Sequence, residues 1–201
     1  MTSFLTTSSS SHNSQPTTHN SLYEEVIIAG FGGQGVILLG KLLAQAAMKD
    51  GREVTYMPSY GAEVRGGTAH CMVIIADELI ASPLVAQPDA IIIMNEASYK
   101  KFAPKVKTGG LLVLNSSMVT GQERPGTVEV VAVPADDIAV ELGSPKSANM
   151  VALGAYLQKR GLLKPTAAAQ CLGDVLSQRY HKTIPVNEQA LLRGAEFVRN
   201  N

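Results

Sequence analysis

The sequence predicts an α/β fold: a single domain of three layers, with a mostly parallel sheet and a helical C-terminal part. Short apolar runs alternate with helical patterns from Glu24 onward, and these runs are continuously apolar rather than alternating in polarity. Strands of that kind are buried on both faces, as in a parallel sheet covered by helices. Residues 147–199 then carry helical patterns alone, which predicts the helical C-terminal part.

The predicted elements follow one another at short intervals. The first strand is residues 26–29, and glycines lead from it into a helix predicted from about 35 to 50, with Gly51 as its C-terminal stop. Five further strands are predicted, at 53–57, 69–76, 90–94, 111–114 and 127–131. The other predicted helices are 95–106, 135–142, 147–160, 165–180 and 187–199.

The first helix is apolar over most of its circumference. Its polar side chains Lys41, Gln45 and Lys49 recur every four residues and form one narrow stripe. Such a helix must be buried on more than one side. We expect the sheet on one side and either a neighbouring helix or a partner subunit on the other.

Composition limits the class of protein. The chain has 201 residues, and its 17 basic residues balance 17 acidic ones, which argues against nucleic-acid binding or a basic membrane patch. Charged residues make up only 17% of the chain, so we expect part of the surface to lie against other subunits.

The N-terminal residues differ in composition from the rest of the chain. Residues 1–21 include twelve Ser or Thr and no Lys, Arg, Asp or Glu, which predicts a disordered tail before one domain at 22–201. The tail lacks the features of a signal peptide, and no later segment is apolar enough to span a membrane. We therefore expect a cytoplasmic protein.

The first candidate site is the turn Gly30-Phe31-Gly32-Gly33-Gln34-Gly35, between a strand and a helix. That context is typical of a Rossmann-like phosphate cradle, with Gly32, Gly33, Gln34 and Gly35 as candidate cofactor-binding residues. The alternative is a tight packing turn without a ligand. An NAD or FAD site also needs an acid after the second strand, where this chain has Tyr56-Met57-Pro58-Ser59-Tyr60.

The second candidate site is the loop at 59–68. Arg65, Gly66, Gly67 and Thr68 could offer a guanidinium beside bare backbone N–H groups to a phosphate or carboxylate. The alternative is a surface ion pair between Glu63 and Arg65 on a long turn.

Cysteine and histidine residues indicate no catalytic or metal site. His70 and Cys71 are neighbours on a predicted strand, so their side chains should point to opposite faces. Cys171 shares the apolar side of its helix and is interpreted as a packing residue. The remaining histidines are too few for a metal site, and we assign no catalytic residue to this chain.

Together the two motifs, Gly30-Phe31-Gly32-Gly33-Gln34-Gly35-Val36 and Ser59-Tyr60-Gly61-Ala62-Glu63-Val64-Arg65-Gly66-Gly67-Thr68, resemble the gamma subunit of 2-oxoacid:ferredoxin oxidoreductases. Ser82-Pro83 and Pro88-Asp89 also look like that family. The likeness covers residues 24–200. The segment Ala-Glu-Val-Arg-Gly-Gly-Thr looks most like the 2-oxoglutarate (KOR) branch. The pyruvate, branched-chain and indolepyruvate branches remain alternatives.

The resemblance implies a subunit of an enzyme that decarboxylates a 2-oxoacid, transfers the acyl group to coenzyme A and reduces ferredoxin. Alpha, beta and delta subunits are the implied partners, and they would hold thiamine diphosphate, magnesium and iron–sulfur clusters. This chain would not be catalytic alone and would help to form the coenzyme A entrance. Two other readings are a nucleotide-binding regulatory module and a scaffold whose glycine turn serves packing only.

Overall fold

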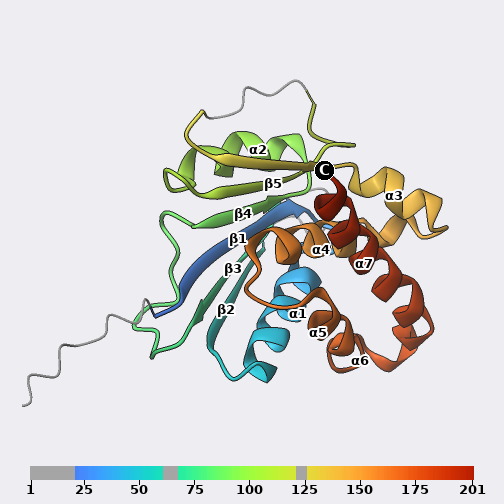
Figure 1. The fold of residues 1–201 in the computed structure, drawn as a ribbon, viewed down its shortest axis with the longest axis horizontal. Helices are drawn as coiled ribbons and strands as arrows, with labels where there is room; N and C mark the ends of the chain where they lie inside the picture. The colour runs from blue at the N-terminus through green and yellow to red at the C-terminus, as the bar shows by residue number, and fades with distance from the viewer. Residues whose placement is uncertain (1–20, 61–67, 121–125) are drawn as a thin grey trace, which may run out of the picture.

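The computed structural model describes residues 21–60, 68–120 and 126–201 and shows six strands in one sheet between two layers of helices (Figure 1). The order of the strands across the sheet is β2-β3-β1-β4-β5-β6. Their bounds are β1 Tyr23–Phe31, β2 Glu53–Tyr60, β3 Thr68–Ala76, β4 Ala90–Ile93, β5 Leu111–Asn115 and β6 Glu129–Val133. The predicted α/β fold is confirmed.

One described strand runs against the others. β1 pairs in parallel with β4, β4 with β5 and β5 with β6, whereas β3 is antiparallel to both β1 and β2. The carboxyl ends of β1, β2, β4, β5 and β6 therefore lie at one end of the sheet, together with the start of β3. Both the glycine turn and the connection from β2 to β3 leave the sheet at this end.

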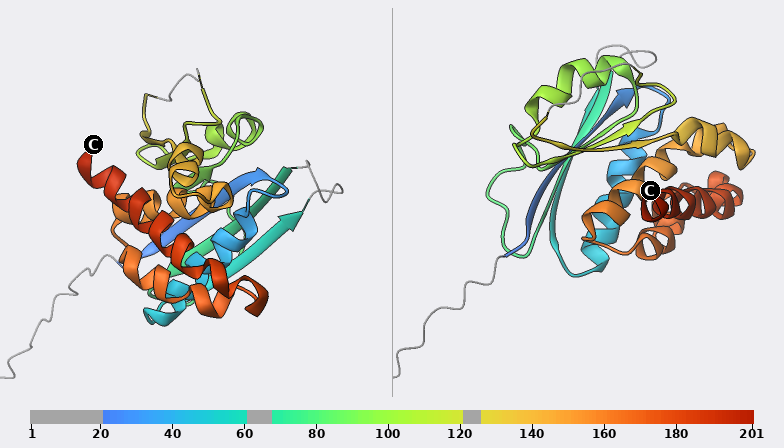
Figure 2. Two further views of the ribbon diagram at one scale, coloured as in Figure 1. Left: turned by 90° about the vertical axis from the view of Figure 1, so that its right-hand side faces the viewer. Right: turned by 45° about the horizontal axis from the view of Figure 1, so that its top comes forward.

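One face of the sheet is covered by most of the helices (Figure 2). Helices α1 and α4 pack on the strands, and α7 packs on α4. The second covered side of α1 is formed by α4, α5 and α6, so neighbouring helices bury it. The helices on this face are α1 Val36–Lys49, α3 Ala135–Glu141, α4 Ala148–Arg160, α5 Pro165–Gln170, α6 Leu172–Val175 and α7 Ile184–Asn200.

The opposite face has a thinner cover. Helix α2 (Glu96–Phe102) and a 3-10 turn at Ala103–Lys105 pack over β1 and β4. The predicted helix at 95–106 is thus shorter and divided, because Pro104 has no N–H to continue the α-helical hydrogen bonds. Over β3 the cover is the loop that follows this strand, anchored by the buried Val85.

Three other elements differ from their predicted bounds. The helix predicted at 165–180 is divided into α5, α6 and a 3-10 helix at Gln178–Thr183. The first break is at Cys171, and the extended backbone of Leu176 and Ser177 makes the second. The strand predicted at 127–131 lies two residues later, at Glu129–Val133, because Gly126 and Thr127 form a turn. The final helix starts earlier than predicted, with Pro185 in its first turn.

Helices α4 and α7 approach each other at backbone distance. A Cβ atom placed on Gly154 would lie 1.8 Å from the carbonyl oxygen of Leu191, and one on Gly194 would lie 1.9 Å from that of Val151. A side chain at either glycine would force the two helices apart. Glycine is therefore required here for close packing rather than for backbone freedom.

A buried acid links the first strand to α4. Glu24 is 2% exposed, and its carboxylate accepts hydrogen bonds from Arg160, at 2.7 Å from Nε, and from the Tyr156 hydroxyl at 3.3 Å. Burial raises the pKa of Glu24, while the Arg160 guanidinium works in the opposite direction. The fully buried Tyr156 also has a raised pKa because of burial, so it stays a neutral donor.

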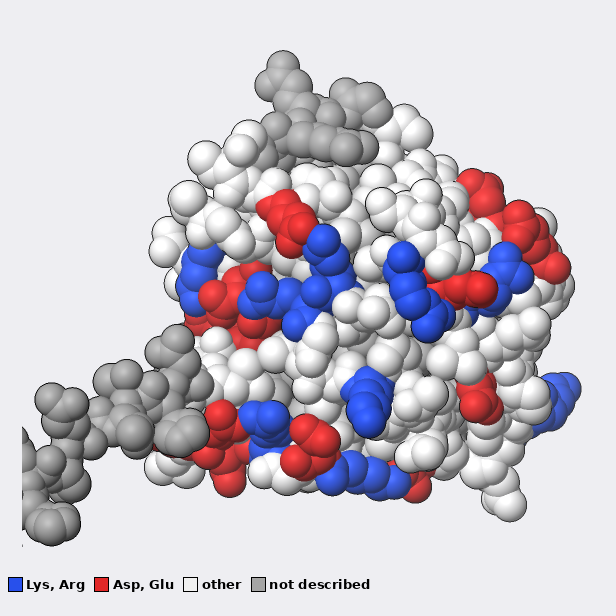
Figure 3. Space-filling model, in the orientation of Figure 1, with Lys and Arg blue, Asp and Glu red and all other residues white. Residues whose placement is uncertain are grey.

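The charges on the described surface are mixed. On the face drawn in Figure 3, basic and acidic side chains lie next to one another along the molecule, as expected for a chain with a net charge of zero. Within the described ranges, no helix combines the length and apolar character needed to cross a membrane. The tail at 1–20 and the residues 61–67 lie outside these ranges.

Candidate functional site

The glycine turn joins β1 to α1 at the carboxyl end of the sheet. Gly35 has a φ of 73° and forms the N-cap of α1, and Gly33 has a φ of 109°. A Cβ on Gly35 would lie 2.4 Å from Nδ2 of Asn149, whereas one on Gly33 would meet no atom within 4 Å. Gly35 is thus constrained both by its backbone and by α4, while Gly33 is exposed and faces open space.

The side chain of Gln34 folds back into the protein. Its Oε1 accepts hydrogen bonds from the Phe31 N–H at 3.0 Å and from Nδ2 of Asn95 at 2.9 Å. Its Nε2 donates to the carbonyl of Met94 at 3.0 Å. Gln34 therefore holds the glycine turn against the end of β4, and a ligand at this turn would meet backbone groups more readily than the Gln34 amide.

Two buried asparagines at strand ends extend this network. Asn95, after β4, caps α2 by accepting from the Ser98 N–H at 2.8 Å. Asn115, the last residue of β5, donates to the Met94 carbonyl at 3.4 Å and to Asp136, and it accepts from the Ala135 N–H at 3.2 Å. The end of β4 is thus tied to α2, which follows it, and the end of β5 is tied to α3, which follows β6.

A third asparagine reaches the turn from the C-terminal part. Asn149 of α4 is 3% exposed and donates from Nδ2 to the Gly35 carbonyl at 3.2 Å. Sequence reasoning missed all three asparagines. A signal was present for Asn95 and Asn115, because each directly follows a buried apolar run; Asn149 has no comparable local signal.

A groove of about 360 Å³ opens beside this network. Phe31 and Thr68 are register partners in β1 and β3, so they bring the end of the glycine-turn strand beside the start of β3. The Glu96 carboxylate in the groove pairs with Lys100 at 2.7 Å. The lining residues are Phe31, Thr68, Asn95, Glu96, Ala97 and Met118.

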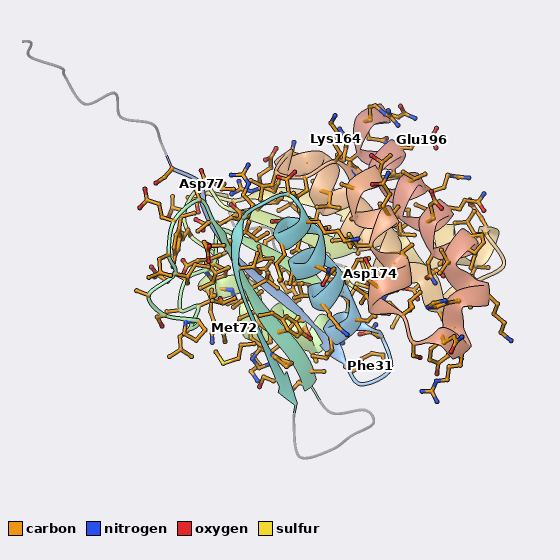
Figure 4. The ribbon with its side chains drawn as sticks, turned by 90° about the horizontal axis from the view of Figure 1, so that it is seen from below. Phe31, Met72, Asp77, Lys164, Asp174 and Glu196 are labelled. Atoms are coloured by element: carbon orange, nitrogen blue, oxygen red, sulfur yellow. The ribbon has the colours of Figure 1, made fainter. Side chains whose placement is uncertain are left out.

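The two predicted motifs therefore approach the same end of the sheet. Thr68 lines the groove, and Gly32 to Gly35 lie between the end of β1 and the start of α1. Arg65, Gly66 and Gly67 fall outside the described residues. Figure 4 shows Phe31 near this end of the sheet. The described lining includes a carboxylate and no Lys or Arg, so an anion bound here would need a cation from elsewhere.

Cys71 and His70 lie on opposite faces of the sheet and do not form a nucleophile–base pair. Burial raises the pKa of the Cys71 thiol to about 12, and Cys71 faces α1, where its sulfur lies 3.4 Å from the Val36 carbonyl. His70 points to the opposite face and packs on Phe102, with ring centres 4.9 Å apart, as the alternation of the strand predicted. Burial, together with Lys101 and Lys105, lowers the pKa of His70.

The described ranges contain no group of three or more His, Cys, Asp or Glu side chains that could hold a metal ion. Cys171, predicted to be a packing residue, is 1% exposed and belongs to the core beneath α1. Its pKa is also raised by burial.

Two solved structures have folds similar to that of this chain. The gamma subunit of a keto/oxoacid ferredoxin oxidoreductase from Geobacter sulfurreducens is 30% identical, with a TM-score of 0.75 over 89% of this chain and 99% of that one. The 2-oxoglutarate:ferredoxin oxidoreductase of Magnetococcus marinus, with 2-oxoglutarate, coenzyme A and succinyl-CoA bound, is 25% identical. Its TM-score is 0.79 over 89% of this chain but 31% of that one.

Curated relatives fall into two length classes. The ketoisovalerate oxidoreductase subunit VorA of Methanothermobacter thermautotrophicus is 39% identical over 88% of this chain, which spans only 36% of that relative. The 2-oxoglutarate synthase subunit KorC of Methanocaldococcus jannaschii is 33% identical over 75% of this chain and 82% of its own length.

The resemblance stated from the glycine turn and the Arg-Gly-Gly loop is confirmed by these similarities. Residues 25–197, nearly the whole described domain, match the family described as pyruvate ferredoxin/flavodoxin oxidoreductase. The chain belongs to the pyruvate ferredoxin/flavodoxin oxidoreductase family.

Proposed function

We propose that this chain is the gamma-type component of a 2-oxoacid:ferredoxin oxidoreductase and that its complex acts on 2-oxoglutarate. The observation that supports this most is the near full-length likeness to separate gamma-type subunits, 99% of one solved chain and 82% of KorC. The reaction cleaves the bond between the carboxylate and the oxo carbon, releases CO₂, forms a thioester with coenzyme A and passes two electrons to ferredoxin.

In this proposal the redox and thiamine chemistry belongs to partner subunits. Alpha, beta and delta subunits would hold thiamine diphosphate, magnesium and iron–sulfur clusters, which supply the carbanion chemistry and electron transfer. The described residues of this chain support a positioning role, since buried amides fix the glycine turn against the sheet. The complex would be cytoplasmic.

We further propose that coenzyme A lies beside the groove, at the end of the sheet where the glycine turn and Thr68 are located. The N-terminal N–H groups of α1 and the Arg65-Gly66-Gly67-Thr68 loop are suited to phosphate oxygens, and Thr68 lines the groove. Because the described lining has no cation, Arg65 would supply the positive charge. The M. marinus enzyme whose fold this chain shares was solved with coenzyme A bound.

The test starts from the native complex, isolated through a tag on this chain. We expect ferredoxin or another one-electron acceptor to be reduced with coenzyme A and 2-oxoglutarate, and more slowly with pyruvate, 2-oxoisovalerate or indolepyruvate. Recovery of the chain without a thiamine-containing partner would reject the proposal. A preference for another oxoacid would reject the assignment to 2-oxoglutarate only.

Coenzyme A contact is tested by Arg65→Ala in the assembled complex. Loss of one charge-assisted phosphate contact is expected to raise the KM for coenzyme A by roughly tenfold, with the KM for the oxoacid unchanged. Arg199→Ala, at an exposed position of α7, is the matched control and should change neither value. An unaltered KM for coenzyme A in Arg65→Ala would reject this contact.

A further inference from the structure

The β2–β3 hairpin has a half-exposed face turned away from α1. Tyr56 points toward α1, where its hydroxyl donates to the Ile37 carbonyl at 2.9 Å, so the alternation of β2 places Thr55 and Met57 on the other side. In β3, Met72 lies opposite Met57 in the register and on the same side. Figure 4 shows Met72 on the side of the sheet away from α1.

The loop after β3 extends this face with strongly exposed apolar side chains. Leu79 is 87% exposed and Leu84 is 66% exposed. The loop is fixed rather than free, because Val85 is buried and its N–H lies 3.5 Å from the sulfur of Met72. We call this surface the hairpin face; its members are Thr55, Met57, Ser59, His70, Met72, Leu79 and Leu84.

The composition of the hairpin face is that of an interface centre. None of the seven members is Asp, Glu, Lys or Arg. Charged residues border them: Glu53, on the same side of β2 as Thr55, lies with the Arg52–Asp77 pair at one end. Glu78 precedes Leu79 in the loop, and Lys101 lies at the other end. An uncharged apolar centre with a charged rim is typical of protein–protein contacts. A contiguous exposed apolar patch with a polar rim marks a protein–protein contact site.

The lengths of relatives indicate what covers this face. The same domain is 36% of VorA and 31% of the M. marinus chain, so in those proteins it is joined covalently to a much larger partner. In KorC and the G. sulfurreducens gamma subunit it is almost the entire chain. A domain that functions without the covalent link must hold the same partner through its surface, since it loses the effective concentration that linkage provides.

We infer that the hairpin face docks on an uncharged apolar surface of the protein that corresponds to the remaining part of those longer relatives. This inference rests on the proposed function, in which that partner belongs to the thiamine-dependent complex. The hairpin also leads to the end of the sheet where Thr68 and the groove lie. Docking through this face would therefore place the groove close to the partner.

The first test is site-specific photo-crosslinking in the native complex. p-Benzoylphenylalanine at Leu84 is expected to crosslink to the subunit homologous to the rest of VorA, identified by mass spectrometry. The control is the same group at Val140, which is 59% exposed on α3 at the other side of the molecule (Figure 1). Crosslinking from Leu84 to a second copy of this chain, or to a different subunit, would overturn the inference.

The second test uses charge. Leu79→Lys with Leu84→Lys should leave the thermal unfolding of the isolated chain unchanged, because both side chains are exposed, and lower its recovery in the complex at least about tenfold. Val140→Lys should assemble normally. Wild-type recovery of the double variant overturns the inference, whereas failure of the unaltered chain to bring down a thiamine-containing partner rejects the proposed function as well.

Discussion

The helix-covered face under α1 and α4 and the hairpin face, on the opposite side of β2 and β3, are covered in different ways. On the face under α1 and α4, the backbones of α4 and α7 are in contact at two glycines. The side chain of the buried Glu24 is hydrogen-bonded to Arg160 of α4. The hairpin face ends in half-buried methionines and exposed leucines. The difference separates two tasks: the helix-covered face supplies the stability of the isolated chain, and the hairpin face is free to serve a partner.

A substitution at the glycine contact between α4 and α7 should reduce the stability of the chain most. Gly154→Ala would place a methyl group 1.8 Å from a backbone carbonyl, so α4 and α7 must separate, and we expect a loss of about 3 kcal/mol or more in the free energy of unfolding. Urea unfolding measures this. The matched control is Gly173→Ala, where a Cβ meets no atom within 4 Å. Equal effects at the two positions would contradict the packing argument.

The next largest loss of stability is expected when the buried carboxylate of Glu24 loses its charged partner. Arg160→Met removes the charge that opposes the burial of Glu24, and we expect a loss of about 2–3 kcal/mol at pH 7. The value lies below that of a fully buried pair because the Arg160 side chain is 30% exposed. Chemical unfolding at several pH values measures it.

The sign of the pH dependence follows from the raised pKa of Glu24. The folded carboxyl binds its proton more tightly than the unfolded one, so stability falls as the pH rises from the ordinary glutamate value of about 4.3 toward the raised folded value. Without Arg160 this fall is larger, so the variant should lose less stability at pH 5 than at pH 7. The double variant Glu24→Gln, Arg160→Met should lack this extra dependence; if it persists, Glu24 is not the group responsible.

These two features show where sequence reasoning stops. The strands were predictable because continuous apolar runs such as 90–94 and 111–114 satisfy a local rule. The predicted start of the first strand was too late, since Glu24 looks like a solvent-exposed end until Arg160, 136 positions later, is brought beside it. The breaks in the helix predicted at 165–180 likewise depend on packing against α1 and α7 rather than on apolar spacing.

The candidate site was predicted in part. Its position was recognisable, because a glycine turn between a strand and a helix has a defined place at the carboxyl end of a sheet. The internal role of Gln34 was not, since it depends on Met94 and Asn95 from the next parallel strand. The Arg65 contact stays a prediction.

Substitutions in the glycine turn are expected to reduce the free energy of unfolding by a smaller amount. Gly35→Ala combines a left-handed backbone with a Cβ 2.4 Å from Asn149, for an expected loss of about 2–3 kcal/mol. Gly33→Ala should cost only the backbone part, about 1–2 kcal/mol, because its Cβ faces open space.

A double-mutant cycle separates the two contributions. Asn149→Ala should relieve the contact in Gly35→Ala, so the double variant should be more stable than the sum of the single losses predicts. Thermal or urea unfolding of the four proteins measures the coupling. Strict additivity would show that α4 does not press on the turn.

The smallest loss of stability is expected for a substitution on the hairpin face. Leu84→Ser changes a side chain that is already 66% exposed, so the free energy of unfolding of the isolated chain should change by less than about 0.5 kcal/mol. Leu153→Ser, at a fully buried position of α4, is the contrasting variant and should cost several-fold more. Because folding alone does not require Leu84, a measurable loss in the isolated chain would mean that the loop belongs to the core, and the separation of tasks between the two faces would be wrong.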